Sequence, residues 1–298
     1  MAQAIDIHVH PGTHEWLGEA MGPFRGDAER HFGTPVPERT VDEMAEEFRG
    51  QGILAVLLAW NAGAGSGLPP VTNEFVASCV AAHPDVFVGF ASVDPWQGKK
   101  AEAELRYALD ELGLKGVKFH PTAQAFEPND RRFYPLYEIA TERRCPLLFH
   151  TGTTGLGINT RGGGGLKLGY SRPIFLDDVA ADFPDADIVA AHPSWPWQDE
   201  MLAVARHKAN VWIDLSGWSP RRWSPELAAA VLGDLQDRVL FGTDYPFIVF
   251  DRWLKAFRSY DPSPELERKV LLDNASRLLN LDQPSMNGPG APGRKEEA

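Results

Sequence analysis

Two histidines near the N-terminus have the spacing of a metal-binding pair. His8 and His10 belong to a short apolar run, residues 5–10, in which every second residue is polar. In a β-strand alternate side chains share one face, so we expect Asp6, His8 and His10 to point one way and the aliphatic residues the other. Two imidazoles on one strand face can hold one metal ion, and the alternative is a strand with two hydrogen-bonded histidines.

Further titratable side chains stand at the ends of later apolar runs. They are Lys118, His120, His150, His192, Asp214 and Asp244. In a barrel of parallel strands these ends converge on one face, where active sites are built. Several histidines with an aspartate and no thiolate suit one divalent ion, Zn²⁺ first and Mn²⁺ or Fe²⁺ as alternatives. Such an ion polarises a substrate oxygen or lowers the pKa of a bound water to about 7.

The elements that must position these residues alternate along the chain. Short runs rich in β-branched residues predict strands at 5–10, 53–60, 86–93, 116–120, 146–151, 188–192, 211–215 and 239–244. Helical patterns occupy 40–49, 72–82, 99–112, 132–143, 174–183, 197–208, 224–235, 249–258 and 264–279. This alternation predicts an α/β fold, a (β/α)8 TIM barrel in one domain. A doubly wound sheet is the alternative, but it needs a glycine-rich turn after the first strand, where this chain has His-Val-His-Pro.

Two connections after predicted strands are long, at 11–39 after the first strand and at 152–172 after the fifth. Long βα loops in a barrel build or cover the site. The second loop is rich in glycine, but it fits no phosphate-binding motif, so we interpret it as a lid or close-approach loop. We assign residues 1–280 to the barrel and expect 281–298, rich in Pro, Gly and charge, to be a disordered tail.

Composition narrows the classes of partner. Lys and Arg number 29 against 41 Asp and Glu, a net charge of −12 with no basic run. This balance argues against nucleic acid and anionic membrane surfaces and leaves a small-molecule substrate. The sequence has no signal-peptide pattern and no apolar run long enough for a bilayer. With Cys79 and Cys145 interpreted as free thiols, we expect a cytoplasmic protein.

Five separated motifs carry a resemblance to a known family. They are Ile5–His10, Gly116–Pro121, Phe149–Gly152, Ala191–Pro193 and Leu240–Pro246. In this order they resemble the amidohydrolase superfamily, and they are most similar to its amidohydrolase-2 branch, the group of aminocarboxymuconate semialdehyde decarboxylase. The resemblance implies a mononuclear metal site with His8, His10, His150 and Asp244 as ligands. It further implies that His192 is the acid–base histidine beside the metal, and that the protein is a homodimer.

Candidate substrate contacts come from strand ends and loops. We interpret Lys118 and His120 as substrate-facing, although a salt-bridged Lys118 lining the barrel is an alternative. Aromatic residues in or near βα loops suggest a cavity mouth for a planar substrate. The alternative is that they cap the barrel or form a subunit interface. The aromatic residues that we predict to contact the substrate are Trp16, Trp60 and Trp195. Arg161 and Arg221 lie in loops on the same side and could clamp a carboxylate, the alternative being solvated surface arginines.

Three functions compete on this basis. The branch contains decarboxylases, hydratases, lactonases and other hydrolases, several of which act on carboxylated aromatic compounds. We predict a metal-dependent non-oxidative decarboxylase in which Asp244 or His192 passes a proton to a ring carbon. The alternative is a hydrolase of a lactone, ester or related bond, with Asp244 as the base and Lys118 or an arginine stabilising the oxyanion. A barrel with a structural metal or none is the third possibility.

Overall fold

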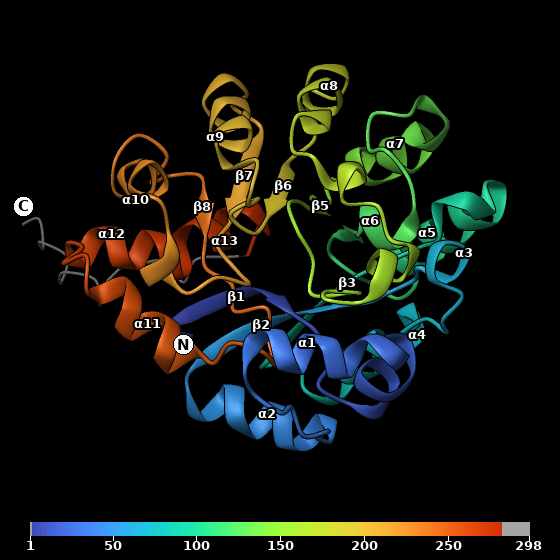
Figure 1. Ribbon diagram of the computed structural model, residues 1–298, viewed down its shortest axis with the longest axis horizontal. Coiled ribbons are helices and arrows are strands. Elements are labelled where there is room, and N and C mark those ends of the chain that lie inside the picture. The colour runs from blue at the N-terminus through green and yellow to red at the C-terminus, as the bar shows by residue number, and fades with distance from the viewer. Residues whose placement is uncertain (1, 282–298) are drawn as a thin grey trace, which may run out of the picture.

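The computed structural model describes residues 2–281, and within them eight parallel strands form the barrel (Figure 1). The strands are β1 (Ala4–Val9), β2 (Ile53–Leu58), β3 (Phe87–Phe90), β4 (Val117–Phe119), β5 (Leu147–His150), β6 (Ile188–Ala191), β7 (Val211–Asp214) and β8 (Val239–Leu240). They pair in chain order within two groups, β1–β3 and β4–β8. Bridges between Ala91 and Val117 and between Val9 and Tyr245 join the groups. The predicted (β/α)8 barrel is confirmed.

Helices surround the strands (Figure 1). They are α1 (Arg25–Phe32), α2 (Val41–Gly50), α3 (Gly63–Ser66), α4 (Asn73–Ala82), α5 (Lys99–Asp110), α6 (Pro121–Gln124), α7 (Tyr134–Glu142), α8 (Phe175–Asp182), α9 (Gln198–His207), α10 (Pro225–Leu232), α11 (Phe250–Arg258), α12 (Pro264–Arg268) and α13 (Asn274–Leu278). Local signals set several helix starts: Thr40 and Glu43 form a capping box at α2, and Ser224 caps α10.

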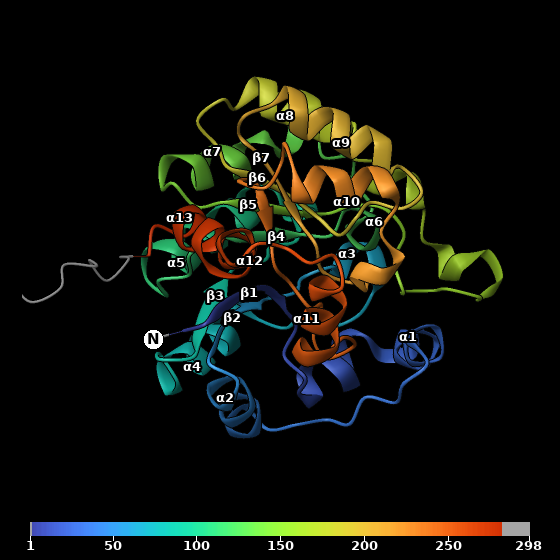
Figure 2. The ribbon, with the colours of Figure 1, turned by 90° about the vertical axis from the view of Figure 1, so that its left-hand side faces the viewer.

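The two long connections contain more structure than expected. The segment after β1 holds a π-helical turn, Glu15–Ala20, a 3-10 turn, Gly22–Phe24, and helix α1. The segment after β5 holds 3-10 turns at Arg161–Gly165 and Leu168–Ser171. It projects from the body of the barrel on the side of α1 (Figure 2), and a 2.6 Å hydrogen bond from Thr160 Oγ1 to Asp27 Oδ2 links the two.

A register shift in β1 corrects the predicted alternation. Asp6 pairs with Ala55 and Val9 with Leu57, so β1 has one extra residue between them, as at a β-bulge. Ile5, before the shift, and Ile7, within it, pack in the cluster inside the barrel, whereas Val9, after it, packs in the outer core. The expectation that Asp6 shares a face with His8 and His10 is therefore wrong, because the bulge turns only the two histidines towards the strand-end cavity.

The barrel interior is apolar below that cavity. The cluster there combines side chains from the strands with three residues at the C-terminal end, Ala275, Leu278 and Leu279. Both cysteines are free. No helix among residues 2–281 is long and apolar enough to cross a membrane. The tail predicted for 281–298 lies, apart from its first residue, outside the described residues.

Candidate active site

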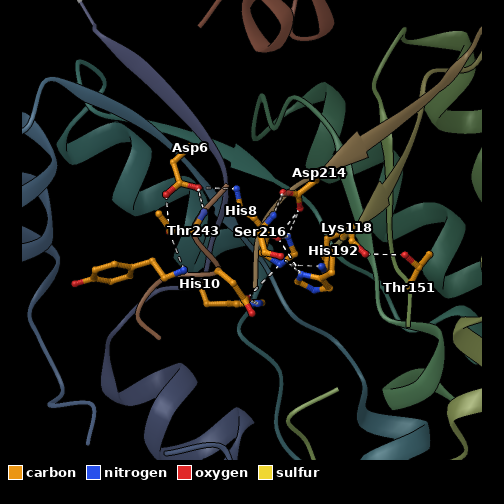
Figure 3. A network of polar contacts seen from close by, with 12 residues as sticks. Asp6, His8, His10, Lys118, Thr151, His192, Asp214, Ser216 and Thr243 are labelled. Carbon is orange, nitrogen blue, oxygen red and sulfur yellow. Dashed lines mark hydrogen bonds and ion pairs between the residues drawn. The ribbon is translucent and has the colours of Figure 1, made fainter. Parts of the chain in front are cut away.

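A cavity opens at the C-terminal ends of the strands. Its lining includes seven of the titratable residues that the sequence places at strand ends: His8, His10, Lys118, His120, His150, His192 and Asp244. They come from β1, β4, β5 and β6, or the residues just after them, and from the segment after β8. Figure 3 shows the part of this cluster around His8. Residues up to 236 positions apart in the chain thus meet in one cavity.

Asp214 sets the orientation of the His8 ring. Asp214 Oδ2 lies 2.6 Å from His8 Nδ1, and both side chains are fully buried. The carboxylate accepts the Nδ1 hydrogen, so the lone pair of the neutral ring is on Nε2. That nitrogen faces the cavity, 3.6 Å from Asp244 Oδ1 and 3.1 Å from Lys118 Nζ. A carboxylate behind a histidine is the arrangement that fixes metal-ligating imidazoles in proteins.

His10 meets the same carboxylate from the other side. Its Nε2 lies 3.5 Å from Asp244 Oδ1. Two ligand atoms each about 2.1 Å from one tetrahedral ion are separated by about 3.4 Å. The distances from Asp244 Oδ1 to the two histidines therefore fit a shared ion. Trp16 stacks on the His10 ring with centroids 4.3 Å apart and holds it in this position.

His192 is connected to His8 through Ser216. His192 Nδ1 lies 2.9 Å from Ser216 Oγ and 3.2 Å from the Ser216 carbonyl oxygen, and Ser216 Oγ donates to Asp214 Oδ2 at 2.8 Å. His192 and Asp244 both have positive φ angles, +71° and +63°. Non-glycine residues rarely adopt this conformation, and it accumulates at functional sites.

His150 is supported by His120. The two rings stack with centroids 3.8 Å apart. His120 Nδ1 accepts a hydrogen bond from the Ala123 amide, which places its ring hydrogen on Nε2. His150 Nε2 is buried and has no hydrogen-bond partner among the described residues. An unpartnered buried nitrogen is costly, so this lone pair is suited to a ligand in the cavity.

Burial dominates the protonation of the cluster. Burial lowers the pKa of four histidines well below the ordinary value, and the charge of Lys118 acts in the same direction. The four are His8, His10, His120 and His150. Burial lowers the pKa of His192 to about 4. Burial also raises the pKa of Asp244 to about 7 and lowers that of Lys118 to about 8, and the charge of Lys118 opposes the shift at Asp244.

The donor set fits a divalent metal ion. His8, His192 and Asp244 each offer one ligand atom, and these atoms lie within 4.8 Å of one another. Burial favours the neutral form of the five imidazoles, which is the form that binds metals. A cation beside Asp244 would favour its ionised form and offset the effect of burial. Nitrogen and carboxylate donors without thiolate are consistent with Zn²⁺, Mn²⁺ or Fe²⁺.

The predicted substrate contacts divide into two groups. Lys118, His120, Trp16 and Trp60 line the cavity. Lys118 is 1% exposed and has no carboxylate within ion-pair distance in the described chain, which argues against the salt-bridged alternative.

The other predicted contacts, Arg161, Trp195 and Arg221, are exposed and do not belong to the cavity lining. Trp195 is 55% exposed and packs near Trp218, which itself lines the cavity. The structure therefore does not bring these three to the site, because the loops that carry them turn their side chains outward.

Several residues of the site were not predicted. The sequence places Asp214 at a strand end but indicates no role for it, although its alternation with Trp212 in β7 directs it towards the barrel axis. Nothing in the sequence singles out Ser216. Arg222 and Arg252 line the cavity from the segments after β7 and β8, and no sequence signal distinguishes Arg222 from its neighbour Arg221.

Comparisons with known proteins agree with the barrel fold. The sequence profile of the amidohydrolase family matches residues 5–281. Protein fluG of Emericella nidulans is 26% identical over an alignment of 166 residues that covers 48% of this chain. The match spans 18% of fluG, so it covers a minor part of that relative.

Solved structures share the fold over nearly the whole chain. An uncharacterised TIM-barrel protein of Bordetella bronchiseptica is 28% identical with a TM-score of 0.76, over 93% of this chain and 98% of that one. A dihydroxybenzoic acid decarboxylase of Polaromonas sp. JS666 with bound manganese and 2-nitroresorcinol is 18% identical, TM-score 0.65, over 95% and 98%. A probable 2-pyrone-4,6-dicarboxylic acid hydrolase of Acinetobacter baumannii is 16% identical, TM-score 0.63, over 93% and 99%.

Proposed function

Because this chain belongs to the amidohydrolase family, we propose that it is a metal-dependent non-oxidative decarboxylase of a small aromatic or unsaturated carboxylic acid. One observation carries the proposal: the buried His and Asp cluster shares its cavity with a wall of aromatic side chains. That wall comprises Trp16, Phe32, Trp60, Trp218 and Phe247. Flat apolar walls beside a few convergent polar groups suit a planar substrate. The Polaromonas protein, which has a similar fold, is a dihydroxybenzoic acid decarboxylase.

The metal ligands in this proposal are His8, His10, His150 and Asp244. The distances of His8 and His10 from Asp244 Oδ1 and the unpartnered Nε2 of His150 support this set. His192 also has a ring nitrogen within 4.8 Å of ligand atoms of His8 and Asp244, and we assign it to the proton step. When bound, a divalent ion supplies Lewis acidity that polarises a substrate carboxylate or hydroxyl oxygen. We propose Zn²⁺ first because imidazole nitrogens dominate the donor set, with Mn²⁺ or Fe²⁺ as alternatives.

The proton step belongs to Asp244 and His192. Asp244 faces the cavity with 16% of its side chain exposed, and His192 lines the same cavity. One of them takes up a proton from solvent and transfers it to the ring carbon that bears the carboxylate. The carbon–carboxylate bond then breaks, its electron pair restores the aromatic ring, and CO2 leaves. The Ser216 contact holds the Nδ1 side of His192, so its Nε2 is directed to the substrate.

The second candidate is hydrolysis of a lactone, ester or related bond. The observation that favours it is Lys118, a buried amine 3.1 Å from His8 Nε2 in the cavity. In this reaction Asp244 acts as the base towards a water molecule, and Lys118 stabilises the oxyanion that forms on the substrate. The probable pyrone-dicarboxylic acid hydrolase of Acinetobacter baumannii shares the fold.

Product analysis separates the two reactions. The metal-loaded protein would be incubated with 2,4-dihydroxybenzoate-like acids and, separately, with lactones. Release of CO2 with the decarboxylated phenol supports the first proposal, and acid release from lactones without CO2 supports the second. Absence of stoichiometric metal in the purified protein, with no effect of chelator, would contradict both.

Two substitutions test the assigned ligands. We expect His10→Ala and Asp244→Asn to lower turnover by at least about a thousandfold, because each removes a metal ligand and Asp244 also handles the proton. His207→Ala is the matched control, since His207 is an exposed histidine in α9 and should leave turnover unchanged. Steady-state kinetics with metal analysis checks the result. Substantial activity in either ligand variant removes that residue from the site.

The compartment, the oligomeric state and the domain organisation form a further proposal. We propose that the protein works in the cytoplasm as a homodimer and that residues 1–280 form one domain. Two free cysteines are consistent with a reducing compartment. Sedimentation analysis at micromolar concentration would test the dimer, and a monomer under those conditions would contradict it.

A further inference from the structure

Two arginines that line the cavity have no carboxylate partner among the residues that the structure describes. Most arginines in the described part of the chain are paired with an acid; examples are Arg25 with Glu38 and Arg143 with Asp110. By contrast, neither Arg222 nor Arg252 has an ion pair or a side-chain hydrogen bond within residues 2–281. Both arginines of the cavity lining are therefore without an acidic partner in the described part of the chain, although the whole sequence carries a net charge of −12.

These arginines reach the cavity from exposed segments after β7 and β8. Arg222 ends a 3-10 turn, Pro220–Arg222, after β7, and Arg252 lies in the first turns of α11 after β8. Both side chains are exposed, whereas the histidines at the strand ends are buried. Apolar lining residues on the same two segments, Trp218 and Phe247, belong to the wall of the cavity.

The charge of the lining favours an anion. The charged lining side chains are Lys118, Arg222 and Arg252 against one carboxylate, Asp244. A concave site lined by one sign of charge concentrates ligands of the opposite sign. The planar guanidinium group in addition matches carboxylate and phosphate oxygens through paired hydrogen bonds.

We infer that the substrate carries a second anionic group, a carboxylate or a phosphate, which Arg222 and Arg252 bind at the cavity mouth while its reacting group lies at the histidine cluster. The inference rests on the proposed function, because that function places the reacting carboxylate at the cluster. The aromatic wall would contact the apolar body of the substrate between its two charged ends. The substrate class is therefore a dianion with a flat apolar centre, and Arg222 and Arg252 determine specificity.

Equilibrium binding to the metal-loaded protein tests the inference without turnover. The probes are two monoanions, benzoate and cinnamate, and two ligands with a second anionic group, 4-carboxycinnamate and 4-carboxyphenyl phosphate. Isothermal titration or the fluorescence of the lining tryptophans gives the dissociation constants. We expect at least one ligand of the second pair to bind about tenfold or more tightly than its monoanionic counterpart, the effect of one charge-assisted hydrogen bond. Comparison of the two shows whether carboxylate or phosphate is preferred.

The variant R222Q/R252Q should lose this advantage and keep its affinity for the monoanions. The matched control is R144Q/K115Q, which removes two exposed positive charges at the opposite ends of β5 and β4, where neither side chain has an ion pair among the described residues. The control should retain the advantage. High salt should reduce it in the wild type, because the arginines are exposed.

Three results would overturn the inference: no advantage for either ligand with a second anionic group, an advantage that survives R222Q/R252Q, or an equal loss in the control. Failure of the proposed function gives a different result. If the proposed function is wrong, the monoanions bind with the same affinity after the metal is removed. The ligands with a second anionic group still bind more tightly than the monoanions, and this difference still depends on the two arginines, which supports the inference.

Discussion

At the scale of single residues, the site depends on a chain of short hydrogen bonds behind the rings of His8 and His192. His192 Nδ1 donates to Ser216 Oγ, Ser216 Oγ donates to Asp214 Oδ2, and His8 Nδ1 donates to the same carboxylate. All four side chains are buried. The chain fixes the tautomer of two histidines at once, so both present Nε2 to the cavity.

Removing the charge of Asp214 tests this role. We expect Asp214→Asn to weaken binding of Zn²⁺ or Mn²⁺ by about 10- to 100-fold, because His8 loses the carboxylate that orients its ring and raises its basicity. Metal affinity would be measured by competition with a chromophoric chelator. Asp199→Asn, an exposed aspartate in α9, is the matched control and should keep the wild-type affinity. An affinity unchanged in Asp214→Asn would show that the contact does not position His8.

At the scale of elements, the site lies where β1 meets the segment after β8. Backbone amides cross this seam: Ile7 N donates to the Phe241 carbonyl, and Asp244 N donates to the His8 carbonyl at 3.0 Å. Asp6 reinforces the seam, since its carboxylate accepts from the Thr243 amide at 2.9 Å and from Thr243 Oγ1 at 2.6 Å. Figure 3 shows this pair beside the histidines. The seam sets the position of Asp244, whose φ is positive.

Thr243→Val should weaken the seam. The variant keeps the side-chain shape but leaves a buried Asp6 oxygen without its hydroxyl donor, which costs about 1–3 kcal/mol of unfolding free energy. Thr141→Val is the control, because the Thr141 hydroxyl bonds a carbonyl within α7 and is half-buried. Urea unfolding measures both. Equal losses in the two variants would contradict a special role for the seam.

Asp6 also predicts a pH dependence of stability. Burial raises its pKa from the ordinary 3.8 to about 7, against the hydrogen bonds from Thr243. The folded state therefore holds the Asp6 proton more tightly than the unfolded state. Between about pH 4 and pH 7 this contribution to the free energy of unfolding falls as pH rises, by up to about 1.4 kcal/mol per pH unit.

Asp6→Asn lacks this titration. In metal-free protein, the difference in unfolding free energy, Asp6→Asn minus wild type, should increase from pH 5 to pH 7. The comparison cancels the other titrating groups, which both proteins share. A difference that does not change with pH would show that Asp6 has a similar pKa in the folded and unfolded states.

At the scale of the whole molecule, a bound ion would connect strands from opposite ends of the chain. The proposed ligands come from β1, β5 and the segment after β8, and these are brought together only in the folded barrel. An ion that binds only the folded state stabilises it by about 2.7 kcal/mol at a hundredfold excess over the dissociation constant.

Metal removal should therefore lower the melting temperature. We expect the addition of Zn²⁺ or Mn²⁺ to chelator-treated protein to raise Tm by several degrees, and Asp244→Asn to abolish this rise because it removes a ligand. Differential scanning calorimetry measures the shift, and Mg²⁺ serves as a control ion, since it favours oxygen ligands. A Tm that does not respond to chelator or to added metal would contradict a resident ion.

Much of the architecture followed from local patterns. The alternation of strand and helix predicted the barrel, because each element type leaves its own periodicity in the sequence. Thr40 and Ser224 marked helix starts, because capping depends on residues within one turn. The positions of His120, His150 and His192 at strand ends predicted their convergence, because parallel strands in a barrel bring their C-terminal ends to one face.

Tertiary structure decided what those patterns could not encode. The bulge in β1 separates Asp6 from His8, and only pairing with β2 reveals it. Arg222 lines the cavity whereas its neighbour Arg221 does not, because the packing of the loop after β7 against distant elements sets their directions. Ser216 contacts His8, which is 208 positions away in the sequence, and His192, which is 24 positions away. Local sequence determines which element forms and which residue ends it, while the direction of a loop side chain depends on contacts with segments far away in the chain.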